Sequence, residues 1–137
     1  MNISKFTQKS VQAVQDLEKV AYEYGNQEVE QEHLLYALLT QEDSLILKLI
    51  EKMEINKDYF INTVKKALDA KVKVSGGDLR FGQYLNKSLV NAENEAKAMG
   101  DEYVSVEHLF LSLLTQPSPS MKKIFNEFGI TRERFLQ

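Results

Sequence analysis

The sequence contains no cysteine and no tryptophan, and only 2 prolines among its 137 residues. Without cysteine there is no disulfide framework and no thiolate metal site, which fits a reducing compartment. No stretch approaches the roughly 18 consecutive apolar residues of a membrane span. The opening residues MNISKFTQ also lack the apolar segment of a secretory signal. We therefore expect a cytoplasmic protein.

The distribution of charges does not indicate a nucleic-acid-binding protein. The net charge is −3, with acidic and basic residues interspersed, whereas a nucleic-acid-binding protein normally carries a basic stripe. The nearest approach to such a stripe is a group of four lysines that we interpret as a solvated helix end, namely Lys65, Lys66, Lys71 and Lys73. A hydrophobic fraction of 43% over this length is typical of one globular domain.

What the chain does contain is an internal repeat. The segment EHLLYALLTQ at residues 32–41 recurs 75 residues later as EHLFLSLLTQ at 107–116. Without a gap, residues 6–62 and 81–137 share 16 identities in 57 pairs, where chance gives about one match in fifteen. We predict a single domain, 1–137, made of repeat 1 (about 4–70), a linker (71–80) and repeat 2 (about 81–137).

Apolar residues at helical spacing predict four short helices in each repeat. Thr7 and Ser105 are expected to cap helix starts, because a hydroxyl can accept from the orphan amides of a first turn. Gly25, Gly100 and Gly129 are expected to end helices, since glycine adopts the left-handed conformation without strain. No such helix buries its apolar stripe alone. The fold class is therefore all-α, with two pseudo-symmetric tandem repeats of four short helices each.

Two further sets of side chains are expected in the interior. The leucines of both EHL helices leave little polar face, so we expect these helices to be buried. Met99 is expected to continue the apolar face of the first helix of repeat 2. The aromatic residues near the repeat starts are also expected to pack inside or between the repeats, namely Phe6, Phe81, Tyr84 and Tyr103.

The sequence carries no phosphate-binding G-x-x-x-x-G-K-[ST] loop, no dinucleotide-binding G-x-G-x-x-G and no arrangement of catalytic residues. A free-standing enzyme is thus unsupported, and we expect no catalytic residue, metal or cofactor in this chain. His33 and His108 occupy equivalent positions, and neither has a second histidine or a cysteine nearby to complete a metal site. Both are interpreted as structural residues held by a backbone carbonyl or a neighbouring acid.

Glu32 and Glu107 stand in the first turn of the two EHL helices. A carboxylate there interacts favourably with the helix dipole, worth about 0.3–1 kcal/mol, or it pairs with a cation on a bound chain. We expect both at exposed helix starts, with Glu107 the favoured substrate contact because Asp101 flanks it. Asp101 has two interpretations as well, since a short acid after a helix-ending glycine can simply satisfy loop amides. Thr7 is first a cap and only secondarily a contact residue.

Taken together, these residues resemble the Clp N-terminal repeat domain family. Each repeat has a Gly-x-x-x-[VI]-x-x-E-H-[LI] segment, and the phrases EYGNQEVEQEHLLYALLTQ and MGDEYVSVEHLFLSLL are most similar to the ClpB disaggregase branch. The resemblance implies binding of unfolded or aggregated polypeptide and its delivery to a hexameric threading ring. ATP and magnesium would belong to modules outside this chain. The last helix is shorter than its counterpart in repeat 1, which also suggests a piece of a longer protein.

The resemblance also implies site residues. In ClpB relatives a threonine, an aspartate and a glutamate tied to substrate handling match Thr7, Asp101 and Glu107; we add Tyr103 and Glu32 as candidate contacts. The family's groove is apolar and partly formed by the first helix of the second repeat, where this chain has polar residues, Asn91 and Glu95. The alternative is a ClpC-type domain that docks an adaptor protein or binds phosphoarginine through the paired glutamates. A fragment of this kind is expected to be monomeric.

Overall fold

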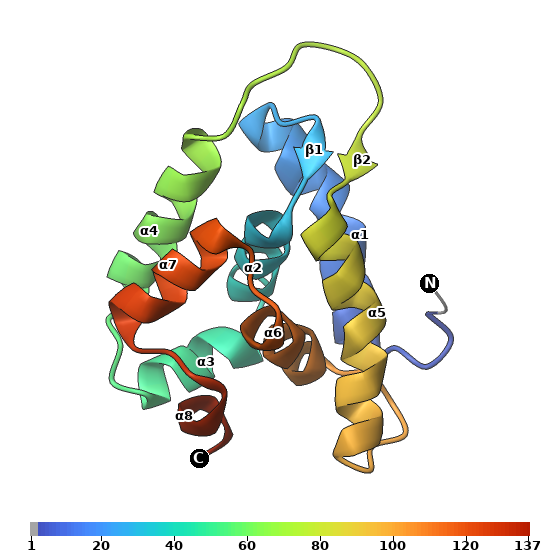
Figure 1. Ribbon diagram of the computed structural model, residues 1–137, viewed down its shortest axis with the longest axis vertical. Helices are drawn as coiled ribbons and strands as arrows, with labels where there is room; N and C mark the ends of the chain where they lie inside the picture. Colours follow the sequence, from blue (N-terminus) through green and yellow to red (C-terminus); the bar gives the residue numbers. More distant parts are fainter. Residues whose placement is uncertain (1–2) are drawn as a thin grey trace.

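The computed structural model describes residues 3–137. Within this range the chain forms eight helices and two strands of two residues each, and Figure 1 follows them in order as α1 (Gln8–Tyr24), β1 (Glu28–Val29), α2 (Gln31–Leu39), α3 (Leu45–Lys52), α4 (Lys57–Asp69), β2 (Arg80–Phe81), α5 (Gln83–Ala98), α6 (Val106–Thr115), α7 (Pro119–Phe128) and α8 (Arg132–Leu136). This confirms the prediction of four short helices per repeat. The two strands were not predicted.

The central pair of the fold is α2 and α6, the two EHL helices. Each packs against the first helix of its own repeat, α2 on α1 and α6 on α5, and the two also contact each other. Figure 1 shows α4 and α7 side by side at one edge of the molecule, with the linker after α4 arching over to β2. The apolar stripes of the duplicated helices are thereby buried in one shared core.

Short backbone pairings tie the repeats to each other. β1 pairs in parallel with β2, with Val29 opposite Phe81, and an isolated parallel bridge joins Phe6 to Val104. Phe81 is the counterpart of Phe6, and Val104 is the counterpart of Val29, 75 residues later in each case. The phenylalanine of each repeat is therefore paired with the valine of the other repeat. The start of each repeat is thus paired with the loop before the EHL helix of the other repeat.

Helix ends follow the local sequence as predicted. The Thr7 side chain accepts a hydrogen bond from the backbone N–H of Ser10, and Ser105 is the N-cap of α6. Gly25 and Gly129 follow α1 and α7 in the left-handed conformation, at φ 70° and 64°. Such ends need only a few neighbouring residues, which is why the sequence suffices to place them.

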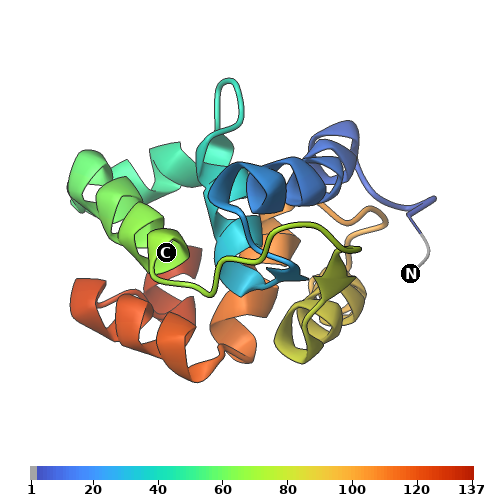
Figure 2. The ribbon, with the colours of Figure 1, turned by 90° about the horizontal axis from the view of Figure 1, so that it is seen from above.

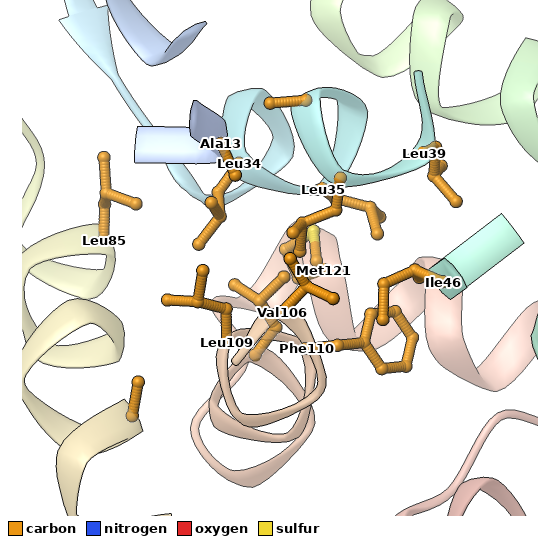
Figure 3. Packing of buried hydrophobic residues seen from close by; sticks show 14 of the residues in the cluster. Ala13, Leu34, Leu35, Leu39, Ile46, Leu85, Val106, Leu109, Phe110 and Met121 are labelled. Carbon is orange, nitrogen blue, oxygen red and sulfur yellow. The ribbon is translucent and has the colours of Figure 1, made fainter. Parts of the chain in front are cut away.

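The core confirms the burial expected of the EHL helices. Leu34 and Leu38 of α2 and Leu109 and Leu113 of α6 have no exposed surface. Figure 3 shows Leu34 and Leu35 facing the α6 side chains Val106, Leu109 and Phe110, with Met121, Ile46 and Leu85 closing the cluster from α7, α3 and α5.

Three of the residues expected in the interior are at the surface instead. Phe6 is buried and Phe81 half-buried, but Tyr84 and Tyr103 are exposed. Met99 is exposed as well, because α5 ends at Ala98 and the chain turns at Gly100 before it can carry the apolar face further. The exposed ring of Tyr103 lies next to two candidate site residues, as described below.

Candidate functional site

The start of α6 is built around His108. Its Nδ1 accepts a hydrogen bond of 2.9 Å from the backbone N–H of Ser105, the N-cap residue. Its Nε2 lies 2.8 Å from Asp101 Oδ2 and donates to that carboxylate. The loop before α6 is therefore held in place by one buried imidazole. This confirms the structural interpretation of His108, with an acid as its partner, and leaves the Asp101 side chain 48% exposed.

The N-terminal segment lies along the same loop. The backbone N–H of Thr7 donates to the carbonyl of Val104 at 3.0 Å, and the N–H of Val104 donates to the carbonyl of Lys5 at 2.8 Å. Lys5 Nζ also lies 5.8 Å from the ring centroid of Tyr103. We name this end of α6 the open mouth, defined by five residues: Thr7, Asp101, Tyr103, Ser105 and Glu107.

The open mouth collects four of the five predicted site residues. Tyr103 is 52% exposed and Glu107 is exposed, with a contact of 3.4 Å from the Ser105 hydroxyl to one carboxylate oxygen. Thr7 mainly fulfils its capping role, since its hydroxyl also lies 3.0 Å from that of Ser10. Asp101, Tyr103 and Glu107 are thus the side chains here that a ligand can reach.

The start of α2 repeats the same backbone plan. His33 Nδ1 accepts from the N–H of Glu30 at 2.8 Å, and its Nε2 donates to Asn26 Oδ1 at 2.9 Å. Both histidines are thus structural, although His33 is held by an amide and a backbone N–H instead of the expected carbonyl or acid. Burial, assisted by the nearby charge of Lys71, lowers the pKa of His33 to about 4, so the imidazole is neutral at pH 7.

The prediction that Glu32 is exposed is wrong. Its side chain is 1% exposed; Lys71 Nζ lies 3.3 Å from Oε1, and the Ser120 hydroxyl donates to Oε2 at 2.5 Å. Lys71 also lies 3.0 Å from Glu30 Oε2 and its side chain is only 14% exposed, so it is no solvated lysine. We name this end of α2 the closed mouth, defined by Asn26, Glu30, Glu32 and the covering Lys71.

A cavity of about 440 Å³ lies beside the closed mouth, between the linker and the two strands. Its walls carry both signs of charge, and they are formed by Asn26, Gln27, Glu28, Glu30, Ala70, Lys71, Val72, Val74 and Arg80. No side chain in it resembles a nucleophile paired with a base.

A second hollow of about 400 Å³ runs along α5. Asn91 lines it, together with the 59% exposed Val90 and with Asn86, Lys87, Asn94 and Gln116. Glu95 does not line it, because its buried carboxylate pairs with Arg132 of α8. The groove surface thus combines a valine with side-chain amides, which can both donate and accept hydrogen bonds.

Gln31 is an important residue that the sequence reasoning missed. Its Nε2 donates to Ser88 Oγ at 2.8 Å and to the carbonyl of Gln116 at 3.0 Å, and its Oε1 accepts from the N–H of Ser118 at 2.8 Å. One buried side chain of repeat 1 thereby joins three parts of repeat 2. The sequence indicates this role in one way: Gln31 occupies a position where repeat 2 has an apolar residue, Val106.

Two other kinds of site concern residues 3–137, a membrane span and a metal site. No helix in this range is long and apolar enough to cross a membrane. Nor does any cluster of three or more histidine, aspartate and glutamate side chains in that range have a geometry that could hold a metal ion.

Comparison with known proteins identifies the same fold and sequence pattern. The Clp repeat (R) N-terminal domain matches residues 5–128. The chaperone protein ClpB of Nitratidesulfovibrio vulgaris is 39% identical over 142 aligned residues, which cover 99% of this chain but only 16% of the relative. The chain thus spans about a sixth of the length of that relative.

Solved structures agree on the fold. The Hsp104 N-terminal domain of Candida albicans superposes with a TM-score of 0.83 at 21% identity, covering 96% of this chain and 87% of that one. A ClpV N-domain in complex with a VipB peptide gives 0.71 at 20% identity, with coverages of 92% and 80%.

Proposed function

Because this chain belongs to the family of Clp repeat N-terminal domains, we propose that it is the substrate-binding module of an ATP-dependent disaggregase of the ClpB type. In this role it engages unfolded or aggregated polypeptide and presents it to a hexameric ring for threading. ATP and magnesium act in other modules of the parent protein, and this module itself is a non-catalytic monomer in the cytoplasm. The division into units at 4–70 and 81–137 stays a prediction, since one core runs through both.

The open mouth is the observation that carries this proposal. Its carboxylates Asp101 and Glu107 and the ring of Tyr103 are accessible, although the histidine beneath them rigidly fixes the loop. Fixed polar groups and an exposed aromatic ring suit weak recognition of many chains, because they can meet backbone amides, cations and apolar side chains. The peptide bound by the ClpV N-domain supports the idea that this fold serves as a peptide receptor.

An NMR titration of the 137-residue protein with a disordered model substrate tests the proposal. We expect progressive shifts of the amide resonances at Thr7, Asp101, Tyr103 and Glu107, with binding in the micromolar range or weaker. Tyr103→Ala combined with Glu107→Gln should reduce binding. Glu23→Gln, which changes an exposed glutamate on α1, is the matched control. If the substrate shifts no resonance of the open mouth, these residues are not its contacts.

The alternative, an adaptor-docking domain of the ClpC type, predicts one defined partner instead of a spread of unfolded chains. Recovery of a single stoichiometric protein by the immobilised domain would favour it. Phosphoarginine recognition through paired glutamates finds less support, because Lys71 and Ser120 already hold the Glu32 carboxylate. Only Glu107 is accessible to a guanidinium, so calorimetry with free phosphoarginine should detect no pair of equivalent sites.

A further inference from the structure

The two mouths share a backbone plan but differ in what lies on them. At the closed mouth, the linker segment Lys71–Val74 lies on the turn at Gly25 and Asn26 and on the start of α2 (Figure 2). The N–H of Val74 donates to the carbonyl of Gly25 at 2.9 Å, and the Asn26 side-chain amide donates to the carbonyl of Val72 at 3.1 Å. Lys71 Nζ completes the attachment at Glu32 and Glu30. The linker is thus held as a bound peptide would be, through main-chain bonds and two lysines, since Lys73 Nζ also donates to the carbonyl of Tyr24.

Two of the acceptors that hold the linker have counterparts 75 residues later, Gly100 for Gly25 and Glu107 for Glu32, whereas Glu30 corresponds to Ser105. Gly25 corresponds to Gly100, and both are left-handed, at φ 70° and 72°. The next residue in each case, Asn26 or Asp101, donates its backbone N–H to α1 or α5 at 2.9 Å and receives the histidine Nε2, at 2.9 and 2.8 Å respectively. Because the local geometry is the same, the carbonyl of Gly100 presents the same acceptor as that of Gly25.

In residues 3–137 no segment takes the place of the linker on this second copy, although Lys5 and Thr7 of the N-terminal segment pair with Val104 of the same loop. No donor in that range reaches the Gly100 carbonyl, and Glu107 meets the Ser105 hydroxyl instead of a lysine. Glu107 corresponds to Glu32, whose carboxylate is neutralised by Lys71. The open mouth therefore shares the Gly100 carbonyl and the Glu107 carboxylate with the closed mouth, and within the described residues neither group is bound by a counterpart of the linker.

The charges select the kind of occupant. Asn26 offers an N–H to the linker carbonyl, whereas Asp101 has only acceptor oxygens at this position. Lys5 is directed to Glu102, at 3.6 Å, and among residues 3–137 no lysine or arginine pairs with Asp101 or Glu107. Two such carboxylates favour a ligand that brings N–H groups and a positive charge.

From these observations we infer that the linker is an intramolecular occupant of the closed mouth, and that the open mouth binds an extended, lysine-bearing segment of another polypeptide in the same register. In that register a main-chain N–H of the bound segment donates to the Gly100 carbonyl, and a lysine three residues earlier reaches Glu107. This inference rests on the proposed function and names the class of segment that the site takes.

The linker itself supplies the probe. A capped hexapeptide with the sequence AKVKVS, identical to residues 70–75, is titrated into the 15N-labelled protein. We expect shifts at Gly100, Asp101 and Glu107 and none at Gly25. Glu107→Gln should weaken binding by about two- to five-fold, the effect of one exposed ion pair. A hexapeptide with alanine in place of the first lysine should weaken it by a similar factor.

Release of the linker gives a second readout. Lys71→Ala removes the cation that pairs with Glu32, so the hexapeptide should now also shift Gly25 and Asn26, which raises the number of sites from one to two. If this variant does not fold, Lys71→Met keeps the apolar length of the side chain without its charge, leaves Glu32 in place and should show the same shifts. An unchanged single site in the folded variant would overturn the role assigned to the linker.

The disordered substrate of the previous section separates the two proposals. If that substrate binds but AKVKVS shifts no resonance of the open mouth, the inference is wrong and the proposed function stands. Equal binding of the peptides with and without the first lysine would also overturn it. If neither substrate nor hexapeptide binds, both proposals fail.

Discussion

The closed and open mouths show which part of a duplicated unit is constrained and which is free to change. In both, a histidine receives the N-cap N–H at Nδ1 and holds the residue after a left-handed glycine through Nε2. These local bonds have been kept. The equivalent glutamates, by contrast, differ completely: Glu32 is enclosed by Lys71 and Ser120, and Glu107 is exposed. The hydrogen bonds of the histidines are thus the same in the two repeats, whereas the surroundings of the glutamate carboxylates differ.

The largest expected effects concern the scaffold, where the repeats should behave alike. Leu38 and Leu113 are equivalent, and neither has exposed surface. We expect Leu38→Ala and Leu113→Ala each to lower the free energy of unfolding by about 2–5 kcal/mol, from lost apolar burial and the cavity left behind. Urea unfolding at pH 7 measures both. If one variant lost stability and the other did not, Leu38 and Leu113 would not be equivalent in the shared core.

Substitution of the two equivalent glutamates should change the free energy of unfolding by different amounts. Glu32→Ala leaves the half-buried Lys71 and the Ser120 hydroxyl without their shared partner. Removing one partner of a fully buried pair costs about 3–5 kcal/mol. Because Lys71 keeps Glu30 and some exposure, we expect about 2–3 kcal/mol here. Glu107→Ala should change the free energy of unfolding by less than about 0.5 kcal/mol, as for most surface positions.

Glu32→Gln refines this measurement, because the amide oxygen can still accept from Ser120 while the charge is lost. The variant should fall between Glu32→Ala and the unaltered protein in urea unfolding. Equal effects of Glu32→Ala and Glu107→Ala would show that the closed mouth opens readily in solution.

The residues involved also show how far the sequence could predict this fold. Thr7, Gly25 and Gly129 were placed correctly, because a helix end depends on a few adjacent residues. The leucine stripes followed from periodicity alone. The burial of Glu32 was missed, since it is created by Lys71, far along the chain, and by Ser120, in the other repeat.

The candidate site could likewise be predicted from the sequence where its residues are neighbours in the chain, but not where it depends on contacts between distant segments. Asp101, Tyr103 and Glu107 lie within seven residues of one another, so their grouping was predictable from the sequence. The pairing that adds Thr7 to them depends on the bridge between Phe6 and Val104, a contact between distant segments. The motif that marks both glutamates is identical in the two repeats, so it contains no information on which of them the linker covers.

The histidine of the closed mouth should make stability depend on pH. Unfolded, His33 takes up its proton near pH 6.5, whereas burial lowers its folded pKa to about 4. Between these values the unfolded state binds more protons, so acidification favours unfolding. From pH 7 to pH 5 this amounts to roughly 2 kcal/mol. Protonation of Nδ1 would also break its bond from the Glu30 N–H.

The measurement is urea unfolding at several pH values between 5 and 7, compared with His33→Gln. The difference between the two proteins removes the background from other titrating groups. The unaltered protein should lose more stability on acidification than the variant does. Parallel pH profiles would mean that His33 titrates alike in the folded and unfolded states.

A further effect, of about 1 kcal/mol, concerns the end of the third helix of each repeat. Glu54 and Gly129 are equivalent and share the left-handed conformation, at φ 63° and 64°. A residue with a Cβ is strained there by about 1 kcal/mol. Glu54→Gly should therefore raise the free energy of unfolding by up to that amount, and Gly129→Ala should lower it.

The two changes should not be mirror images. A Cβ at Gly129 would lie 3.2 Å from Arg134 Nη1, and that guanidinium donates to the carbonyls of Phe128, Gly129 and Met53. One arginine thus caps the third helices of both repeats, and crowding it disturbs both. We expect Gly129→Ala to cost more than Glu54→Gly gains, measured by thermal and urea unfolding. Equal and opposite changes would show that only backbone strain distinguishes the two positions, with Arg134 free to adjust.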